Sequence, residues 1–348
     1  MAHVLDTSPR PHGEGGHVAG ERLLEVDDLH VEFRTPGGVV RAVNGVSYTL
    51  DAGETLAILG ESGSGKSVSA QAIMGILDSP PGFVTGGEIR YRGQDLLRLD
   101  AAAQRALRGE QIAMVFQDAL SALNPVFTVG HQIAEMFRAH RGTSRREARA
   151  RAAELMDRVR IPNARGRLDD YPHQFSGGMR QRVMIAMALA LDPSVLIADE
   201  PTTALDVTVQ AQIMDLLQDL QAQAGTGLIL ITHDLGVVGE VADRVAVMYA
   251  GRIVETGSIH DVFRAPAHPY TVGLMQSVPR VDQRGQALTP IEGAPPSLTR
   301  IPSGCPFHPR CPRRRPEPCE TVVPPLADVR PGRASACHFA EEVLVDQH

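Results

Sequence analysis

Short apolar runs alternate with longer amphipathic segments along most of the chain, and this pattern predicts an α/β fold. The apolar runs predict buried strands at 55–59 (TLAIL), 195–199 (VLIAD), 228–232 (LILIT) and 244–249. Apolar residues at helical spacing predict helices over 68–77, 129–160, 179–191 and 207–223. Because strands and helices alternate, the sheet should be mainly parallel and covered on both faces.

The two ends of the chain depart from this pattern. Near the N-terminus, β-branched stretches at 23–33 and 39–50 flank the turn TPGG and predict an antiparallel pair, with further strands at 88–91 and 112–116. The first twenty residues are rich in Gly, His and Pro, which predicts a disordered tail. After about Ile259 proline becomes frequent and the helical periodicity weakens, so a second unit is expected there.

Composition narrows the classes of function. The 348 residues are 43% hydrophobic and carry a net charge of −7, which disfavours a dedicated nucleic-acid binder. No apolar run approaches the ~18 residues that span a bilayer. A cytosolic protein is expected, unless a partner binds it at a membrane.

The segment Gly60–Ser67 reads G-x-x-x-x-G-K-S and predicts a phosphate-binding loop between a strand and a helix. The chain has 34 basic residues other than histidine, and Lys66 is the one lysine among them. A slender ammonium reaches between phosphates where a broad guanidinium does not fit. The predicted nucleotide contacts are Gly60, Glu61, Ser62, Gly63, Ser64, Gly65, Lys66, Ser67 and Val68, with the Ser67 hydroxyl also binding Mg²⁺.

Two further motifs fit a nucleotide-hydrolysing site. Asp199 ends an apolar strand, so it can bind Mg²⁺ at the sheet edge, and Glu200 follows it, placed to polarise an attacking water. The segment FSGGMRQR brings Ser176, Gly177 and Gly178 to the start of a helix, where backbone amides favour an anion.

With these motifs, residues 22–260 resemble the ATP-binding cassette (ABC) of ABC transporters. By this resemblance, Gln117 contacts Mg²⁺ and water, Asp206 belongs to the D-loop, and His233 contacts the γ-phosphate. Phe33 is expected to stack on adenine. Catalysis is expected from Glu200, His233 and Lys66, and the Mg²⁺ ligands are expected to be Ser67, Gln117 and Asp199.

The resemblance implies a dimer in which each ATP lies between the phosphate loop of one subunit and the Ser-Gly-Gly of the other. The segment FSGGMRQR corresponds to the signature motif of the family. It differs from the commonest form of that motif because Phe175 replaces leucine and Met179 replaces glutamine. Neither change removes the serine or the glycines, so a working composite site is expected.

The C-terminal segment is similar to the D-type ATPase subunits of oligopeptide and dipeptide importers, through HPYTVGLMQSVP, IEGAPPSL and CPFHPRCP. This resemblance implies a heterodimer with a second ATPase, two transmembrane permease subunits, and an extracytoplasmic substrate-binding protein that acts indirectly, with no nucleic-acid partner. The chain would then lie peripherally on the cytoplasmic face of the bacterial inner membrane. Import of nickel or another small solute is the alternative. A non-transport ABC ATPase of DNA repair or translation is more distant, because the chain has no sustained heptads and one phosphate loop.

The four cysteines of the chain lie close together in sequence, at Cys305, Cys311, Cys319 and Cys337. In a cytosolic protein, clustered cysteines favour metal binding over disulfides. Four thiolates on proline-rich loops suit a 4Fe–4S cluster, which the importer resemblance also implies. Zinc, with His308 or His338 as substitute ligands, and free or disulfide-bonded cysteines remain alternatives.

The domains expected are a tail at 1–20, an ABC ATP-binding domain at 21–260, and a C-terminal extension at 261–348. The ATP-binding domain should contain a mainly parallel sheet, an antiparallel β subdomain and a helical signature subdomain at about 118–180. The extension is expected to be small, irregular and metal-binding.

Overall fold

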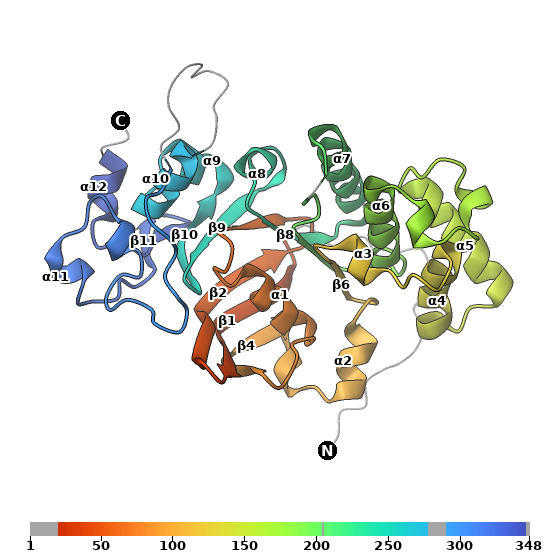
Figure 1. Cartoon of the computed structure of the whole chain (residues 1–348), viewed down its shortest axis with the longest axis horizontal. Helices are drawn as coiled ribbons and strands as arrows, with labels where there is room; N and C mark the ends of the chain where they lie inside the picture. Colours follow the sequence, from red (N-terminus) through yellow and green to blue (C-terminus); the bar gives the residue numbers. More distant parts are fainter. Residues whose placement is uncertain (1–19, 204, 278–289, 346–348) are drawn as a thin grey trace.

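The computed structural model describes residues 20–203, 205–277 and 290–345. In Figure 1 a central region of strands separates a lobe of helices, which contains α4 and α5, from the C-terminal segment at the opposite end. The tail predicted for residues 1–20 lies outside the described residues, apart from Gly20.

The first sheet is the predicted antiparallel subdomain. Its strands run in the order β2-β1-β4-β5, and β1 pairs with both β2 and β4 in antiparallel register. The strand bounds are β1 Arg22–Thr35, β2 Gly38–Asp51, β4 Gly82–Tyr91 and β5 Gln94–Asp95. The TPGG segment forms the turn between β1 and β2, as predicted.

The second sheet has eight strands in the order β11-β12-β10-β9-β3-β8-β7-β6. The strands from β9 to β6 are parallel, and β10, β12 and β11 add to them in antiparallel register. The bounds are β3 Thr55–Leu59, β6 Ile112–Val115, β7 Val195–Asp199, β8 Gly227–Thr232, β9 Arg244–Tyr249, β10 Arg252–Ser258, β11 Ala327–Arg330 and β12 Arg333–Ser335.

The helices lie on both faces of the second sheet and at its ends. Their bounds are α1 Lys66–Met74, α2 Ala101–Leu107, α3 Ala119–Ala122, α4 Val129–Arg141, α5 Arg145–Arg158, α6 Gly177–Ala188, α7 Val207–Ala224, α8 Leu235–Val241, α9 Ile259–Arg264, α10 Pro269–Gln276, α11 Pro316–Cys319 and α12 Ala340–Val345. Short 3-10 turns occur at Leu96–Arg98, Ala164–Arg167, Pro172–Gln174 and His308–Arg310.

Strand β7 shows that the sheet is buried on both faces. Leu196 and Ala198 pack in a core with α4 to α7, whereas Val195 and Ile197 pack in a second core with α1 and the antiparallel subdomain. Successive side chains of a strand point to opposite faces, so this division confirms the predicted two-sided sheet. A third core joins α8 and α10 to Phe307.

Several predicted helix ends were wrong, and glycine explains two of them. The helix predicted over 68–77 begins at Lys66 and ends before Gly75, which has a left-handed conformation (φ 61°). The helical stretch 129–160 is divided by Gly142, also left-handed (φ 61°), into α4 and α5. The helix predicted from Met179 begins at Gly177, because the Ser176 hydroxyl caps it.

The C-terminal segment is more regular than its sequence indicates. It contains α9 to α12, and its strand β12 pairs with β10, so the extension continues the second sheet. The buried Glu255 of β10 binds Arg333 of β12 (Oε1 to Nη2, 2.9 Å) and accepts hydrogen bonds from the N–H groups of Ala267 and His268. None of the helices in the described part of the chain is long and apolar enough to cross a membrane.

Candidate nucleotide site

The loop Gly60–Ser67 connects β3 to α1, as the motif predicts. All three of its glycines have positive φ values, 154° at Gly60, 77° at Gly63 and 104° at Gly65. A Cβ atom at Gly60 would lie 2.3 Å from the carbonyl oxygen of Met248, and one at Gly65 would lie 2.2 Å from that of Ala42. The backbones of β9 and β2 therefore leave no room for a side chain at either position, and the loop packs closely against both strands.

Lys66 lies folded against its own loop. Its Nζ donates hydrogen bonds to the carbonyl oxygens of Gly60 (2.8 Å) and Glu61 (3.1 Å), and the residue is buried. Burial lowers the pKa of the Lys66 ammonium, while the nearby carboxylates of Glu200, Asp199 and Glu61 act in the opposite direction. The structure thus places one buried ammonium at the centre of the loop.

Two of the three residues predicted to bind Mg²⁺, Ser67 and Asp199, lie together. The Ser67 hydroxyl donates to Oδ1 of Asp199 at 2.9 Å, and Asp199 is buried at the end of β7. Burial raises the pKa of Asp199, and the Ser67 hydrogen bond partly offsets this effect. A hydroxyl and a carboxylate oxygen are the hard ligands that Mg²⁺ takes beside nucleotide phosphates, so the donor set fits the ion.

Glu200 lies at the meeting point of three segments. Its Oε2 accepts hydrogen bonds from Gln117 Nε2 and Thr203 Oγ1, both at 2.9 Å, and its Oε1 lies 3.4 Å from His233 Nδ1. Its backbone has a left-handed conformation (φ 46°), rare for a residue with a side chain, which turns the chain sharply after β7. Thr203 was missed in the sequence, although it lies in the PTTALD segment that carries Asp206.

One open cavity brings most of these predicted residues together. It is lined by Glu61, Ser62, Gly63, Gly65, Lys66, Ser67, Val68, Gln117, Glu200 and His233. It unites a phosphate-binding loop, oxygen ligands for a divalent cation, and a carboxylate with polar neighbours. Such a cavity can bind a nucleoside triphosphate with Mg²⁺ and activate a water beside it.

Other predicted residues lie outside this cavity. Ser176, Gly177 and Gly178 are at the N-terminus of α6, and Asp206 caps the N-terminus of α7 by accepting from the Val209 N–H at 3.0 Å. Ser176 and Asp206 are both exposed. A Cβ at Gly178 would lie 2.6 Å from the Val209 side chain, so glycine allows the two helix ends to approach.

Phe33 and Ser64 also lie apart from the cavity lining, as do Gly60 and Asp199. Phe33 is on β1 and packs against the second core, where its ring would lie 3.0 Å from a Cβ at Gly82. Ser64 is within the loop, but its side chain is buried and its hydroxyl has no hydrogen-bond partner among the described residues.

The four cysteines, which are clustered in sequence, also lie together in space. All four are free thiols, and they line one cavity together with His268, Pro269, Phe307, His308, Arg313, His338, Phe339 and Val343. Burial raises the pKa of Cys305 to about 11 and that of Cys337 to about 12. Within the described ranges, no group of three or more His, Cys, Asp or Glu side chains is arranged to hold a metal ion. Because the four thiols are free, the disulfide alternative has no support, whereas the free-cysteine alternative agrees with the structure. The cluster and zinc stay predictions.

The fold and the cavity define a nucleotide-binding ATPase of the phosphate-loop class. Comparisons with known proteins narrow this class. The family described as ABC transporter matches residues 43–203, and that described as oligopeptide/dipeptide transporter, C-terminal region, matches residues 254–319.

Curated relatives and solved structures agree with both family matches. The chain is 53% identical to the oligopeptide transport ATP-binding protein OppD of Salmonella typhimurium, over 93% of this chain and 95% of that protein. It is 54% identical to the dipeptide transport ATP-binding protein DppD of Bacillus subtilis, over 87% of this chain and 90% of that protein. A dimeric ATP-binding cassette in a post-hydrolysis state, bound to ADP and Pi, superposes with a TM-score of 0.62 at 28% identity, over 68% of this chain and 99% of that chain.

This chain belongs to the ABC transporter ATPases, within the group that carries the oligopeptide/dipeptide transporter C-terminal region. The predicted family, the ATPase activity and the α/β nucleotide-binding fold are confirmed, and ATP with Mg²⁺ follows from the family.

Proposed function

We propose that this chain is the ATP-hydrolysing subunit that powers peptide import through an ABC transporter. One observation carries the proposal: the same chain contains the peptide-transporter C-terminal region, at 254–319, and a cavity lined by the phosphate-binding loop and Glu200. The names of relatives above 50% identity support the same cargo.

Within the site, we assign a role to each residue that lines the cavity or ends β7. Lys66 and the loop amides bind the phosphates, and Ser67, Gln117 and Asp199 hold Mg²⁺, which supplies charge neutralisation when bound. Glu200 accepts a proton from the attacking water. His233 contacts the γ-phosphate and, at 3.4 Å from Glu200, keeps that carboxylate oriented.

The active unit is proposed to be a dimer, a heterodimer with a second ATPase, because part of the predicted site lies outside the cavity. Ser176, Gly177 and Gly178 would complete the site of the partner, with Asp206 beside them. Support comes from the exposure of Ser176 and from Val207, whose apolar side chain is 82% exposed next to Asp206. Phe33 would stack on the adenine.

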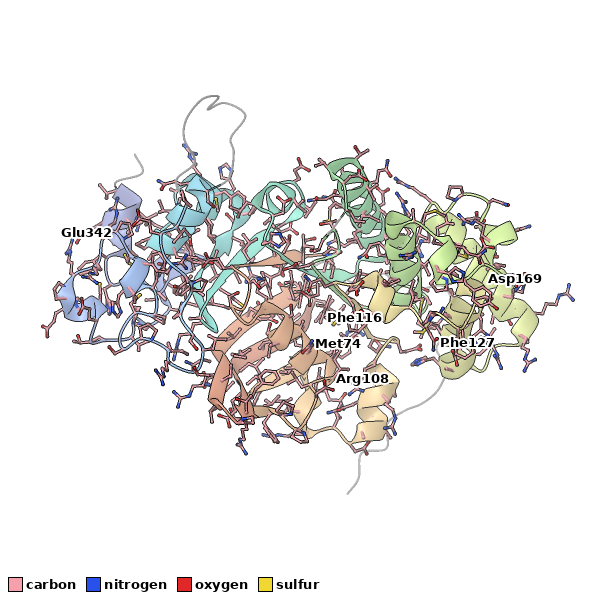
Figure 2. The ribbon with its side chains drawn as sticks, in the orientation of Figure 1. Met74, Arg108, Phe116, Phe127, Asp169 and Glu342 are labelled. Carbon is pink, nitrogen blue, oxygen red and sulfur yellow. The ribbon has the colours of Figure 1, made fainter. Side chains whose placement is uncertain are left out.

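Permease subunits are proposed to bind near Gln117. Apolar side chains are exposed on both sides of α3, and Figure 2 labels two of them, Phe116 and Phe127. These two are 39% and 44% exposed, and Leu120 and Val126 are 58% and 70% exposed. Scattered exposed apolar residues are ordinary, but four of them around one short helix fit a docking surface. This contact would place the chain peripherally on the cytoplasmic face of the inner membrane, with the substrate-binding protein on the other side.

We also propose that the four cysteines ligate a 4Fe–4S cluster. The cluster would lie in the extension at 261–348 and not in the ATP-binding domain at 21–260, which includes the helical subdomain at about 118–180. The convergence of the thiols on one cavity supports it. Iron and sulfide analysis of protein purified without oxygen tests this, and one zinc with no iron would refute it.

Transport assays test the cargo. The chain is co-produced with its permeases and the second ATPase, and the complex is reconstituted into liposomes. The binding protein is then added, and uptake of a labelled tripeptide is compared with uptake of nickel. Peptide uptake that requires ATP and is abolished by Lys66→Ala is expected. Nickel uptake without peptide uptake would refute the peptide cargo and leave the ATPase intact.

A further inference from the structure

Glu61 is an acidic residue in a loop that is expected to surround phosphates. It follows Gly60 directly, and it lines the same cavity as Lys66 and Ser67. A free carboxylate here would repel a polyanion, so what binds Glu61 matters for the nucleotide. Its side-chain partner comes from far along the chain, in the C-terminal segment.

Arg310 forms a two-pronged ion pair with this carboxylate. Its Nη1 lies 2.6 Å from Glu61 Oε2 and its Nη2 lies 3.0 Å from Oε1. The Arg310 side chain is only 6% exposed, and the Glu61 side chain is 26% exposed. The guanidinium is itself fixed, since its Nε donates to the carbonyl of Glu292 at 3.0 Å and its Nη1 also approaches the Tyr249 hydroxyl at 3.4 Å. Two parallel charge-assisted bonds from a fixed donor determine both the charge and the direction of the carboxylate.

A second C-terminal residue binds the backbone of the same loop position. The Tyr270 hydroxyl accepts a hydrogen bond from the Glu61 N–H at 2.9 Å, and Tyr270 is fully buried at the start of α10. Its ring packs against those of Tyr249 (centroids 4.6 Å apart) and Phe307 (5.4 Å). This aromatic cluster fixes the position of the Tyr270 hydroxyl, because closely packed interior side chains move little.

The contacts extend to the lysine of the loop. Lys66 donates to the carbonyl of Glu61, so the same residue is bound at its N–H, its carbonyl and its side chain. We propose that Arg310 and Tyr270 are positioning residues of the nucleotide site: they turn the Glu61 carboxylate away from the phosphates and fix the loop that presents Lys66. The C-terminal extension is then part of the ATP site.

This inference rests on the proposed role of Gly60–Ser67 as the phosphate site, and it makes a specific prediction. In Arg310→Ala the Glu61 carboxylate loses its partner and faces the polyphosphate. The Kd for mant-ATP, a fluorescent ATP analogue, should rise about tenfold when it is measured with Mg²⁺ present. KM for ATP should rise in parallel, and kcat should change less than about threefold. Arg310→Lys, which retains a charge but loses the fork, should be intermediate.

Rescue separates this role from a merely structural one. Adding Glu61→Gln to Arg310→Ala removes the freed charge, so the double variant should bind mant-ATP within about threefold of wild type. Arg314→Ala, an exposed arginine of the same segment, is the matched control and should leave the Kd unchanged. Tyr270→Phe, which removes the acceptor of the Glu61 N–H, should raise the Kd about threefold.

Fluorescence anisotropy of mant-ATP with the full chain measures Kd, and phosphate release with the second ATPase present gives KM and kcat. Thermal unfolding confirms that each variant folds. A Kd of Arg310→Ala within about twofold of wild type would overturn the inference. So would a double variant that binds as weakly as the single one, because the defect would then come from the extension as a whole. If the wild-type chain itself fails to bind mant-ATP, the proposed nucleotide site fails instead.

Discussion

Replacing Glu200 with glutamine tests the proposed hydrolytic mechanism most directly. The side chains of Glu and Gln have the same shape, and two of the contacts of Glu200 are hydrogen bonds that its Oε2 accepts from Gln117 and Thr203. The amide oxygen of Glu200→Gln can accept both. Its NH₂ group then faces Nδ1 of His233, which accepts in one tautomer. The variant should therefore keep the local structure and lose only the negative charge.

The size of the effect follows from this geometry. Loss of a general base costs about 10²–10⁴-fold in rate, and we expect kcat to fall by that factor. Lys66, Ser67 and Asp199 are untouched, so the Kd for ATP should stay within about twofold of wild type. If hydrolysis separates the two subunits, ATP should trap Glu200→Gln as a closed dimer.

Phosphate release and size-exclusion chromatography with and without ATP, both in the presence of the second ATPase, and mant-ATP anisotropy measure the three quantities. Glu240→Gln, a charge removal at an exposed position of α8, is the control and should behave as wild type. Turnover of Glu200→Gln near the wild-type rate would refute the assigned role. Loss of ATP binding would show instead that the charge supports the bound nucleotide.

Three other changes test the loop and the attachment of the C-terminal segment. Gly65→Ala would place its Cβ 2.2 Å from a carbonyl oxygen of β2, so the Kd for mant-ATP should rise more than about tenfold. An unchanged Kd would contradict the close packing of the loop against β2. Arg333→Met leaves the fully buried Glu255 without its ion-pair partner, and urea unfolding should show that the free energy of unfolding falls by about 3 kcal/mol. This value is at the lower end of the range for broken buried ion pairs, because two backbone N–H groups still bind the carboxylate. Burial lowers the pKa of His268 to about 3, so the unfolded chain takes up a proton below pH 6.5 that the folded chain does not, and stability is lost as the pH falls from 6.5 towards 3. His268→Asn retains a helix cap but does not titrate, so between pH 6.5 and 5.5 it should lose about 1 kcal/mol less than wild type in urea unfolding, and equal pH slopes would contradict the assignment.

Local sequence patterns predicted the parallel strands better than the helices, whereas β5, β10, β11 and β12 were missed. Val195–Asp199 and Arg244–Tyr249 have the bounds expected, because an apolar run between polar residues defines a buried strand at both ends. Helix ends depend on single residues such as Gly75 and Gly142, whose left-handed conformation a periodicity does not encode. The helix α10 was missed because it is short and its N-terminus is fixed by contacts from β10.

The candidate site divides in the same way. Residues of contiguous motifs, such as Lys66 and Asp199, were found because the backbone order of strand, loop and helix determines where they lie. The hydrogen bond from Thr203 to Glu200 depends on the left-handed turn after β7. The ion pair of Arg310 and Glu61 joins residues 249 positions apart, and no spacing rule connects them. Both contacts became visible only in three dimensions.

These contacts bear on how hydrolysis would be controlled. The C-terminal segment binds the loop that presents Lys66 through Glu61. The exposed Ser176, in contrast, caps the N-terminus of α6 and lies outside the cavity of its own chain. A complete site would then need three parts: the loop, the extension that orients it, and the Ser-Gly-Gly of a partner subunit. The first two are already joined in the single chain, so ATP binding should not require dimerisation, but hydrolysis should. Separate measurement of the two steps in the isolated chain would show tight mant-ATP binding with negligible phosphate release, and comparable turnover with and without the partner would contradict the composite arrangement.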